Sequence, residues 1–233
     1  MTSQTIFHSL APGAATLFVA LTLATAAHAD IVSSNPNLPV LYPSAYYTNG
    51  SAHATFSAPG VTIALTNLGF AALGSVSLTP SGANELETYS SMLLGDGSVV
   101  GLGHLSFSAT GTATTLVFNR IGNTTGTFST ELLSMSLSAL TPFGSLLIRE
   151  SPTQTSAGQT TITSLGGGQY QIGSYFDVFT ELSLDGGATW IPDTTGPQRI
   201  TLVAPVPEPS TYALAGLAAG LFALKRARWC RKK

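Results

Sequence analysis

The 233-residue chain is poor in cysteine and in charged residues, and both shortages exclude classes of protein. Its single cysteine, Cys230, rules out a disulfide within the chain, and only 9% of its residues are charged. Residues 30–204 contain no lysine and three arginines against ten acidic residues, a formal net charge of −7 with histidine neutral. This acidic balance argues against nucleic acid and anionic lipid as partners. The segment is long enough for one domain whose core needs no disulfide.

The cations of the chain are concentrated at its C-terminus, behind an apolar stretch. Residues 211–224 carry no charge, and as a helix they would be about 21 Å long. With snorkelling basic side chains and Trp229 at the interface, residues 211–229 can cover about 28 Å, against a hydrocarbon core about 30 Å thick. The sequence therefore predicts a transmembrane helix over residues 211–224 and a cytoplasmic C-terminus. The six residues expected to stop transfer are Lys225, Arg226, Arg228, Arg231, Lys232 and Lys233.

A short polar motif, Val206-Pro207-Glu208-Pro209-Ser210, precedes this helix. The two prolines fix φ and push the residues before them into extended geometry, so the motif is expected to be an exposed linker. Motif, helix and basic tail together span residues 205–233 and resemble the PEP-CTERM domain of exported bacterial proteins. The resemblance implies that an exosortase, a membrane protease, recognises Pro207-Glu208-Pro209 while the inner membrane holds the chain transiently. It does not identify the molecular activity of the preceding domain.

The N-terminus has the pattern of a signal peptide. Residues 14–27 are apolar and lead into Ala27-His28-Ala29, a small-x-small cleavage site. The first ten residues depart from the pattern, because they contain no Lys or Arg. We expect a signal peptide over residues 1–29, with Asp30 as the mature N-terminus. The protein would then be exported, and the cell surface or the extracellular space would be its destination.

The segment between these two signals alternates between apolar and polar residues. Leu133, Met135 and Leu137 alternate with serines, and residues 175–184 alternate in the same way. Period-two alternation predicts half-buried antiparallel strands. We therefore predict an all-β domain over residues 30–204, an antiparallel β-sandwich or jelly roll, because the absence of a fixed-period repeat disfavours a propeller or solenoid. Turns are predicted at Asn49-Gly50, Pro59-Gly60, Gly95-Asp96-Gly97, Gly122-Asn123, Gly166-Gly167-Gly168 and Asp185-Gly186-Gly187.

One of these turns lies in a motif that resembles the Asp-box, Ser-x-Asp-x-Gly-x-Thr-Trp. An aspartate in such a turn accepts hydrogen bonds from nearby backbone amides, and its glycines allow positive φ. In its known settings, which include sialidases and other glycan-handling proteins, the box is structural and lies away from the catalytic centre. The resemblance implies a hairpin turn, and a single copy is weak evidence for a propeller. The five matching residues are Ser183, Asp185, Gly187, Thr189 and Trp190.

Two sets of carboxylates are candidates for chemistry. Glu85 and Glu87 share one face of any strand they occupy, about 7 Å apart, a separation that suits inverting glycosidases. On an edge strand such a pair is usually a solvated face, and we prefer that interpretation. Asp177, Glu181 and Asp185 could line a cation site, but they lack the dense spacing of a calcium loop.

No constellation of catalytic or metal-binding residues stands out. His53 and His104 are the only histidines of residues 30–204, and neither has a second metal-type ligand at helical spacing. There is no Gly-x-Ser-x-Gly elbow for a serine nucleophile. We therefore expect no enzymatic activity, no metal and no cofactor.

Three functions remain open at this stage. The first is a structural or adhesive role at the cell surface, in a biofilm or in exopolysaccharide, which the resemblance of the tail favours. The second is a secreted carbohydrate-binding module, which a surface rich in hydroxyl groups permits. The third is a carbohydrate-active enzyme, which would need paired carboxylates in a cleft lined by aromatic residues.

Overall fold

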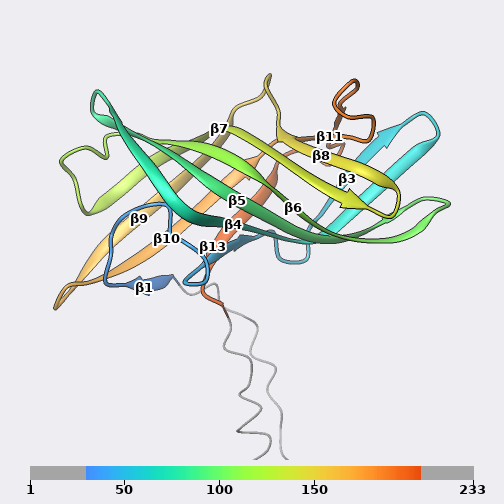
Figure 1. Ribbon diagram of the computed structural model, residues 1–233. Coiled ribbons are helices and arrows are strands. Elements are labelled where there is room, and N and C mark those ends of the chain that lie inside the picture. Colours follow the sequence, from blue (N-terminus) through green and yellow to red (C-terminus); the bar gives the residue numbers. More distant parts are fainter. Residues whose placement is uncertain (1–29, 206–233) are drawn as a thin grey trace, which may run out of the picture.

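A computed structural model describes residues 30–205, which form thirteen β-strands and no helix (Figure 1). The all-β antiparallel prediction is confirmed for this part of the chain. No helix among these residues has the length and apolar character needed to cross a membrane. The predicted signal peptide, sorting motif, helix 211–224 and six stop-transfer residues lie outside the described residues. The strands are β1 (Ile31–Ser33), β2 (Tyr46–Thr48), β3 (His53–Ala58), β4 (Val61–Ser81), β5 (Asn84–Val99), β6 (Gly103–Val117), β7 (Gly126–Thr141), β8 (Gly144–Glu150), β9 (Ser156–Gly166), β10 (Gln169–Val178), β11 (Thr180–Ser183), β12 (Ile191–Pro192) and β13 (Gln198–Val203).

All strands belong to one sheet, and eight of them close it into a ring. The ring runs β10–β13–β2–β4–β5–β6–β7–β9 and returns to β10, because β9 pairs with both β7 and β10. Every strand pair is antiparallel. The strand pairings therefore form one closed sheet, and not the two packed sheets of the predicted sandwich or jelly roll. Strands of up to 21 residues twist and coil enough for the sheet to close on itself.

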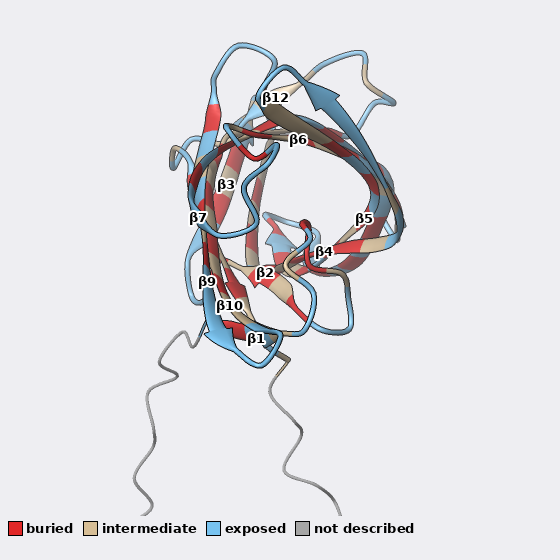
Figure 2. Cartoon of the chain, turned by 90° about the vertical axis from the view of Figure 1, so that its left-hand side faces the viewer, coloured by how far each residue is buried: buried red, intermediate tan, exposed pale blue. Residues whose placement is uncertain are grey.

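The core lies inside this ring. Buried and exposed residues alternate along the strands, so one face of the sheet is enclosed and the other faces solvent (Figure 2). Phe56, Leu65, Ile148, Ile162 and Ile172 are among the large side chains that are almost completely buried. Burying a side chain of this size stabilises the fold by about 1.5–3 kcal/mol. The alternation predicted from the sequence is confirmed in β7 for residues 134–139, whereas Leu133 is exposed because the pairing with β6 skips it between Leu132 and Ser134.

One predicted turn is wrong. Gly95-Asp96-Gly97 lies inside β5, where all three residues pair with β6. A Cβ atom on Gly95 would lie 2.8 Å from both Leu68 Cδ2 and Phe107 Cζ. Gly95 and Gly97 are therefore needed because neighbouring atoms leave no room for a side chain, and not because a turn requires them. The remaining turn signals lie between strands, except that Gly166 is the last residue of β9. Gly50, Gly60, Gly122 and Gly186, in four of these turns, have positive φ.

Candidate functional site

The loop between β11 and β12 contains the Asp-box-like residues, and a network of hydrogen bonds connects them. The Asp185 carboxylate accepts bonds from the Ser183 hydroxyl (2.8 Å), the Thr189 amide (2.9 Å) and the Thr189 hydroxyl (2.5 Å). The Gly187 amide donates to the Ser183 hydroxyl at 2.9 Å. Because these donors favour the ionised form, with the Thr189 hydroxyl first, they lower the pKa of Asp185 to about 2. The Asp185 carboxylate is thus hydrogen-bonded by residues of its own turn.

Trp190 closes this loop against the sheet. The Arg149 guanidinium lies over its ring at 3.9 Å from the ring centroid, close enough for a cation–π interaction. The same guanidinium donates two hydrogen bonds to Glu181 Oε2, at 2.9 and 2.6 Å. Ser151 donates to the other oxygen of Glu181 at 3.0 Å. Arg149 therefore connects the Trp190 ring and the Glu181 carboxylate in one cluster beside the loop.

The three carboxylates considered for a cation site do not converge. Asp177 accepts two hydrogen bonds from Arg199, at 2.8 and 2.7 Å, and this charged partner lowers the pKa of Asp177. Glu181 is bound to Arg149, and Asp185 is held by its own turn. Among the described residues no group of three or more His, Cys, Asp or Glu side chains is placed to hold a metal ion.

Glu87 lies in the interior of the ring, where the sequence interpretation expected a solvated face. β5 is paired on both sides, with β4 and β6, and is not an edge strand. The Glu87 side chain is only 2% exposed, and its Oε1 atom has no hydrogen-bond partner among the described residues. Burial, reinforced by the nearby charge of Glu85 and opposed by Arg120, raises the pKa of Glu87 to about 8. The carboxyl is therefore mostly protonated at physiological pH.

Hydroxyl groups surround this buried carboxyl. Glu87 and Thr130 line a void of about 10 Å³, together with Tyr47, Tyr89 and Thr160, which is about the space of one water molecule. Tyr89 and Thr115 are hydrogen-bonded at 3.0 Å. The cluster is enclosed within the sheet, so it does not have the open cleft that a glycoside hydrolase needs for its substrate. Sequence reasoning missed it because Glu-x-Glu carries no mark of which face is inside.

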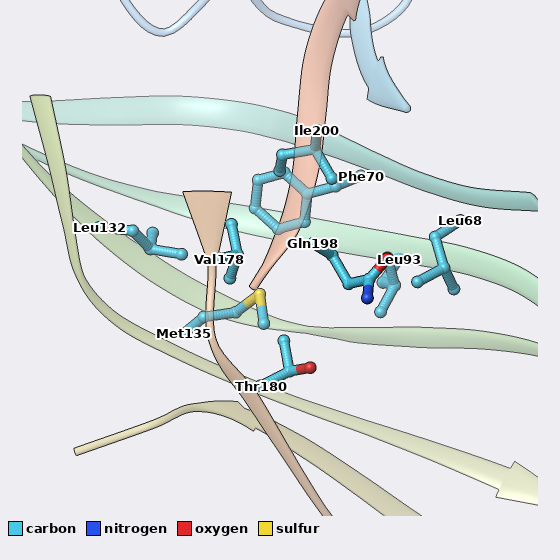
Figure 3. Close-up of a pocket in the computed structure, with 9 residues that line it drawn as sticks. All are labelled: Leu68, Phe70, Leu93, Leu132, Met135, Val178, Thr180, Gln198 and Ile200. Carbon is cyan, nitrogen blue, oxygen red and sulfur yellow. The ribbon is translucent and has the colours of Figure 1, made fainter. Parts of the chain in front are cut away.

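A second interior space is apolar (Figure 3). It measures about 40 Å³ and is lined by Phe70, Met135 and Ile200 among other residues, with Gln198 and Thr180 as polar neighbours. The Gln198 amide group donates to Asp193 at 3.1 Å and to Thr195 at 2.8 Å. An apolar cavity of this kind is expected to stay dry, and it is far too small for a sugar ring.

The outer face of β5, β6 and β7 carries an ordered array of hydroxyl groups, which we call the hydroxyl face. The strand pairing places Ser90, Thr112 and Ser136 in one row, because Ser90 lies opposite Thr112 and Thr112 opposite Ser136. Parallel rows lie on either side, with a two-residue step along each strand, or roughly 7 Å. All members except the half-buried Thr114 are exposed, and none is charged. The hydroxyl face comprises Thr88, Ser90, Thr110, Thr112, Thr114, Ser134, Ser136 and Ser138.

The two histidines lie on separate strands. Among residues 30–205, neither histidine side chain is hydrogen-bonded to a serine or a carboxylate. His53, on β3, lines a surface hollow of about 570 Å³ with Asn49, Thr195 and Arg199. His104 is exposed near the start of β6. The lining of the hollow beside His53 contains no phenylalanine, tyrosine or tryptophan, so it lacks the stacking surface typical of sugar clefts.

Comparison with known families identifies the tail of the chain. Residues 205–232 match the PEP-CTERM protein-sorting motif. Comparison with curated proteins and with solved structures gives no match. The C-terminal segment is therefore a PEP-CTERM sorting motif, as its residues predict. It indicates an exported protein that is processed by an exosortase, a protease of the membrane.

Proposed function

We propose that the protein is a structural or adhesive component of the cell surface or extracellular matrix, and that it contacts exopolysaccharide through its hydroxyl face. The hydroxyl face is the observation that carries this proposal. Each serine or threonine can both donate and accept a hydrogen bond, as sugar hydroxyls do. The array also lacks charge, which suits a neutral polymer better than an anionic one.

The contacts of such a face are individually weak. A hydrogen bond exchanged with water contributes about 0.5–1.5 kcal/mol net, so useful affinity requires several aligned contacts. The strand pairing supplies the alignment, because it fixes the three strands and their rows relative to one another. A polymer of repeating units can engage many such contacts at once, and weak single contacts then add to a stable attachment.

A carbohydrate-active enzyme is the less favoured alternative. Glu87 is buried inside the ring, and its neighbour Glu85 lies 3.9 Å from the Arg120 guanidinium. Glu181 and Asp177 are each bound to an arginine. None of these carboxylates is free in an open cleft, which is the arrangement that a pair of acid and base catalysts requires.

Removing the central row of hydroxyls tests the role of the hydroxyl face. We expect Ser90→Ala, Thr112→Val and Ser136→Ala together to weaken binding of the mature protein to neutral exopolysaccharide by about tenfold or more, because up to three hydrogen bonds of about 1 kcal/mol each are lost. Co-sedimentation with the polymer measures this. The matched control is Thr127→Val with Thr161→Val, a hydroxyl pair 3.2 Å apart on β7 and β9. Equal binding by both variants and the unsubstituted protein would contradict the proposal.

We further propose that the tail holds the precursor in the inner membrane with its C-terminus in the cytoplasm until processing. Pulling six cations through hydrocarbon is prohibitive, so the basic tail would stop transfer and keep Glu208 on the far side of the membrane. Glu208→Ala is expected to leave a full-length precursor in the membrane, while the unsubstituted protein loses its basic tail. Mass spectrometry of the C-terminal peptide distinguishes the two forms. A mature surface protein that still ends in Lys233 would show that the tail is a plain anchor.

A further inference from the structure

The sheet has an open edge between β6 and β7. β6 pairs with β5 along its whole length, from Gly103 to Val117, whereas β7 pairs with β6 only from Thr110 onward. Residues 103–109 are therefore paired on one side only. Within residues 30–205 no main-chain group is hydrogen-bonded to the other side of this stretch. An edge of this kind presents unpaired N–H and C=O groups to any strand that approaches.

A second open stretch, in β4, shows how such an edge is normally protected. Residues 73–81 pair with β5 alone, but the pairing there has an irregularity between Leu73 and Val76 and contains Pro80. Bulges and prolines are the devices that prevent edge-to-edge pairing. Residues 103–109, with the sequence Gly-His-Leu-Ser-Phe-Ser-Ala, contain no proline, lysine, aspartate or glutamate. This edge therefore has none of those devices.

The sequence of this edge is complementary to itself. Leu105, Phe107 and Ala109 point into the core, whereas His104, Ser106 and Ser108 are exposed. Antiparallel pairing of two copies about Ser106 places residue 105 opposite 107 and residue 104 opposite 108. Inward residues then face inward residues and outward residues face outward ones, as a continuous sheet requires. We propose that this edge pairs with the same edge of a second copy, joining two rings into one sheet across a two-fold axis.

The hairpins on both sides of the open edge supply apolar contact. Val100 and Leu102, in the turn between β5 and β6, are 70% and 63% exposed, and Leu140, at the end of β7, is 91% exposed. Both hairpins extend toward the same end of the molecule (Figure 1). A strand of seven residues is only about 24 Å long, so edge pairing with these tips falls near or below the 1,200–2,000 Å² or so of a stable interface. The association is accordingly weak, and a high local concentration is needed to populate it.

Charge does not prevent this contact. The nearest acid is Asp96, which lies opposite Ser106 on β5 and accepts a hydrogen bond from it. In the paired sheet the two Asp96 side chains would be three strand spacings apart, or roughly 14 Å. At physiological salt the screening length is about 8 Å. The repulsion is thus largely screened, and association is expected to strengthen when salt is raised from about 10 to about 150 mM.

A charge exchange tests both the pairing and its register. His104→Lys with Ser108→Lys places like charges opposite each other in the paired edge, and His104→Asp with Ser108→Asp does the same with the opposite sign. We expect each double variant of the mature protein to lose self-association in sedimentation velocity, and an equal mixture of the two to regain it as a one-to-one complex. Gln159→Lys with Thr163→Lys, four residues apart on the exposed side of β9 as 104 and 108 are on β6, is the control and should associate like the unsubstituted protein.

A cross-link gives a second, independent readout. In a Cys230→Ser background, Ser106→Cys should form a disulfide between two copies on mild oxidation, because directly opposed residues of an antiparallel pair are close enough for one. Ser134→Cys should not. Monomeric behaviour of the unsubstituted protein at high concentration would overturn the proposal. So would a lysine variant that associates normally, or a mixture that fails to associate although its components remain folded by circular dichroism.

Discussion

Replacing Glu87 with glutamine is expected to stabilise the folded protein by a few kcal/mol at pH 8 and by much less at pH 5. The carboxyl is buried, one of its oxygens has no hydrogen-bond partner among the described residues, and burial raises its pKa to about 8. In the unfolded chain a glutamate has a pKa of about 4.3. Between these values the folded protein holds a proton that the unfolded chain releases, so stability falls as pH rises, by up to about 1.4 kcal/mol per pH unit. Glutamine cannot ionise and removes this loss.

Denaturant unfolding at pH 5, 6.5 and 8 measures the effect. Glu150 has the same sign, because burial raises its pKa to about 7 against a hydrogen bond from Ser156, so some pH dependence will remain in the Glu87→Gln variant. Ser91→Ala, at a buried hydroxyl of the same strand that also has no hydrogen-bond partner among the described residues, is the control; it removes no ionisable carboxyl and should leave the slope unchanged. An equal gain from Glu87→Gln at pH 5 and pH 8 would mean that hydrogen bonding or packing, and not ionisation, is responsible.

Gly97→Ala is expected to destabilise the protein by about 3 kcal/mol or more, near the upper end of overpacking costs. A Cβ atom at this position would overlap the carbonyl oxygen of Ala64 on β4 and would lie 2.9 Å from Leu65 Cδ2. Because the obstacle is backbone in the paired strand β4, a change of rotamer cannot relieve it. Thermal and denaturant unfolding should both register the loss.

The same substitution at Gly69 is the matched control. Gly69 lies in β4, the strand that pairs with β5, has no positive φ, and would place its Cβ atom 3.8 Å from the nearest heavy atom, Tyr46 Cδ2. Gly69→Ala is therefore expected to change stability by less than about 1 kcal/mol. Similar losses at both positions would show that a general intolerance of side chains in these strands, and not the overlap with Ala64, limits Gly97.

The comparison of sequence and structure shows what local patterns can and cannot predict. Alternation in residues 133–139 identifies a strand because Met135, Leu137 and Ala139 belong to one face, although Leu133 is exposed. β5 gave no such signal, since Glu85 and Glu87 on its inner face are more polar than Leu86 and Met92 on its half-buried outer face. An alternating pattern shows that a strand has two different faces. It does not show which face is enclosed when both faces contain polar and apolar residues.

Strand partners were beyond the reach of the sequence for a related reason. Turn signals between β4, β5 and β6 predict which neighbours in the chain can form hairpins, but the closure of the ring depends on β9 pairing with β7 across a connection that carries β8. That contact is fixed by shape and packing over the whole domain. The glycines of β5 show the same limit, because the residues that exclude a side chain at Gly95 come from β4 and β6.

The first and last strands of the described chain lie along the same neighbour. β1 pairs with β10 at Ile172, and β13 pairs with it from Tyr175 onward, so the points where the chain enters and leaves the sheet are only a few residues apart along β10. Among residues 30–205, no strand pairing of the ring involves a residue beyond Val203. A cut after Val203 therefore removes none of the strand pairings of residues 30–205. We therefore expect the domain to fold while it is still tethered, and its release by a protease to require no rearrangement of residues 30–203.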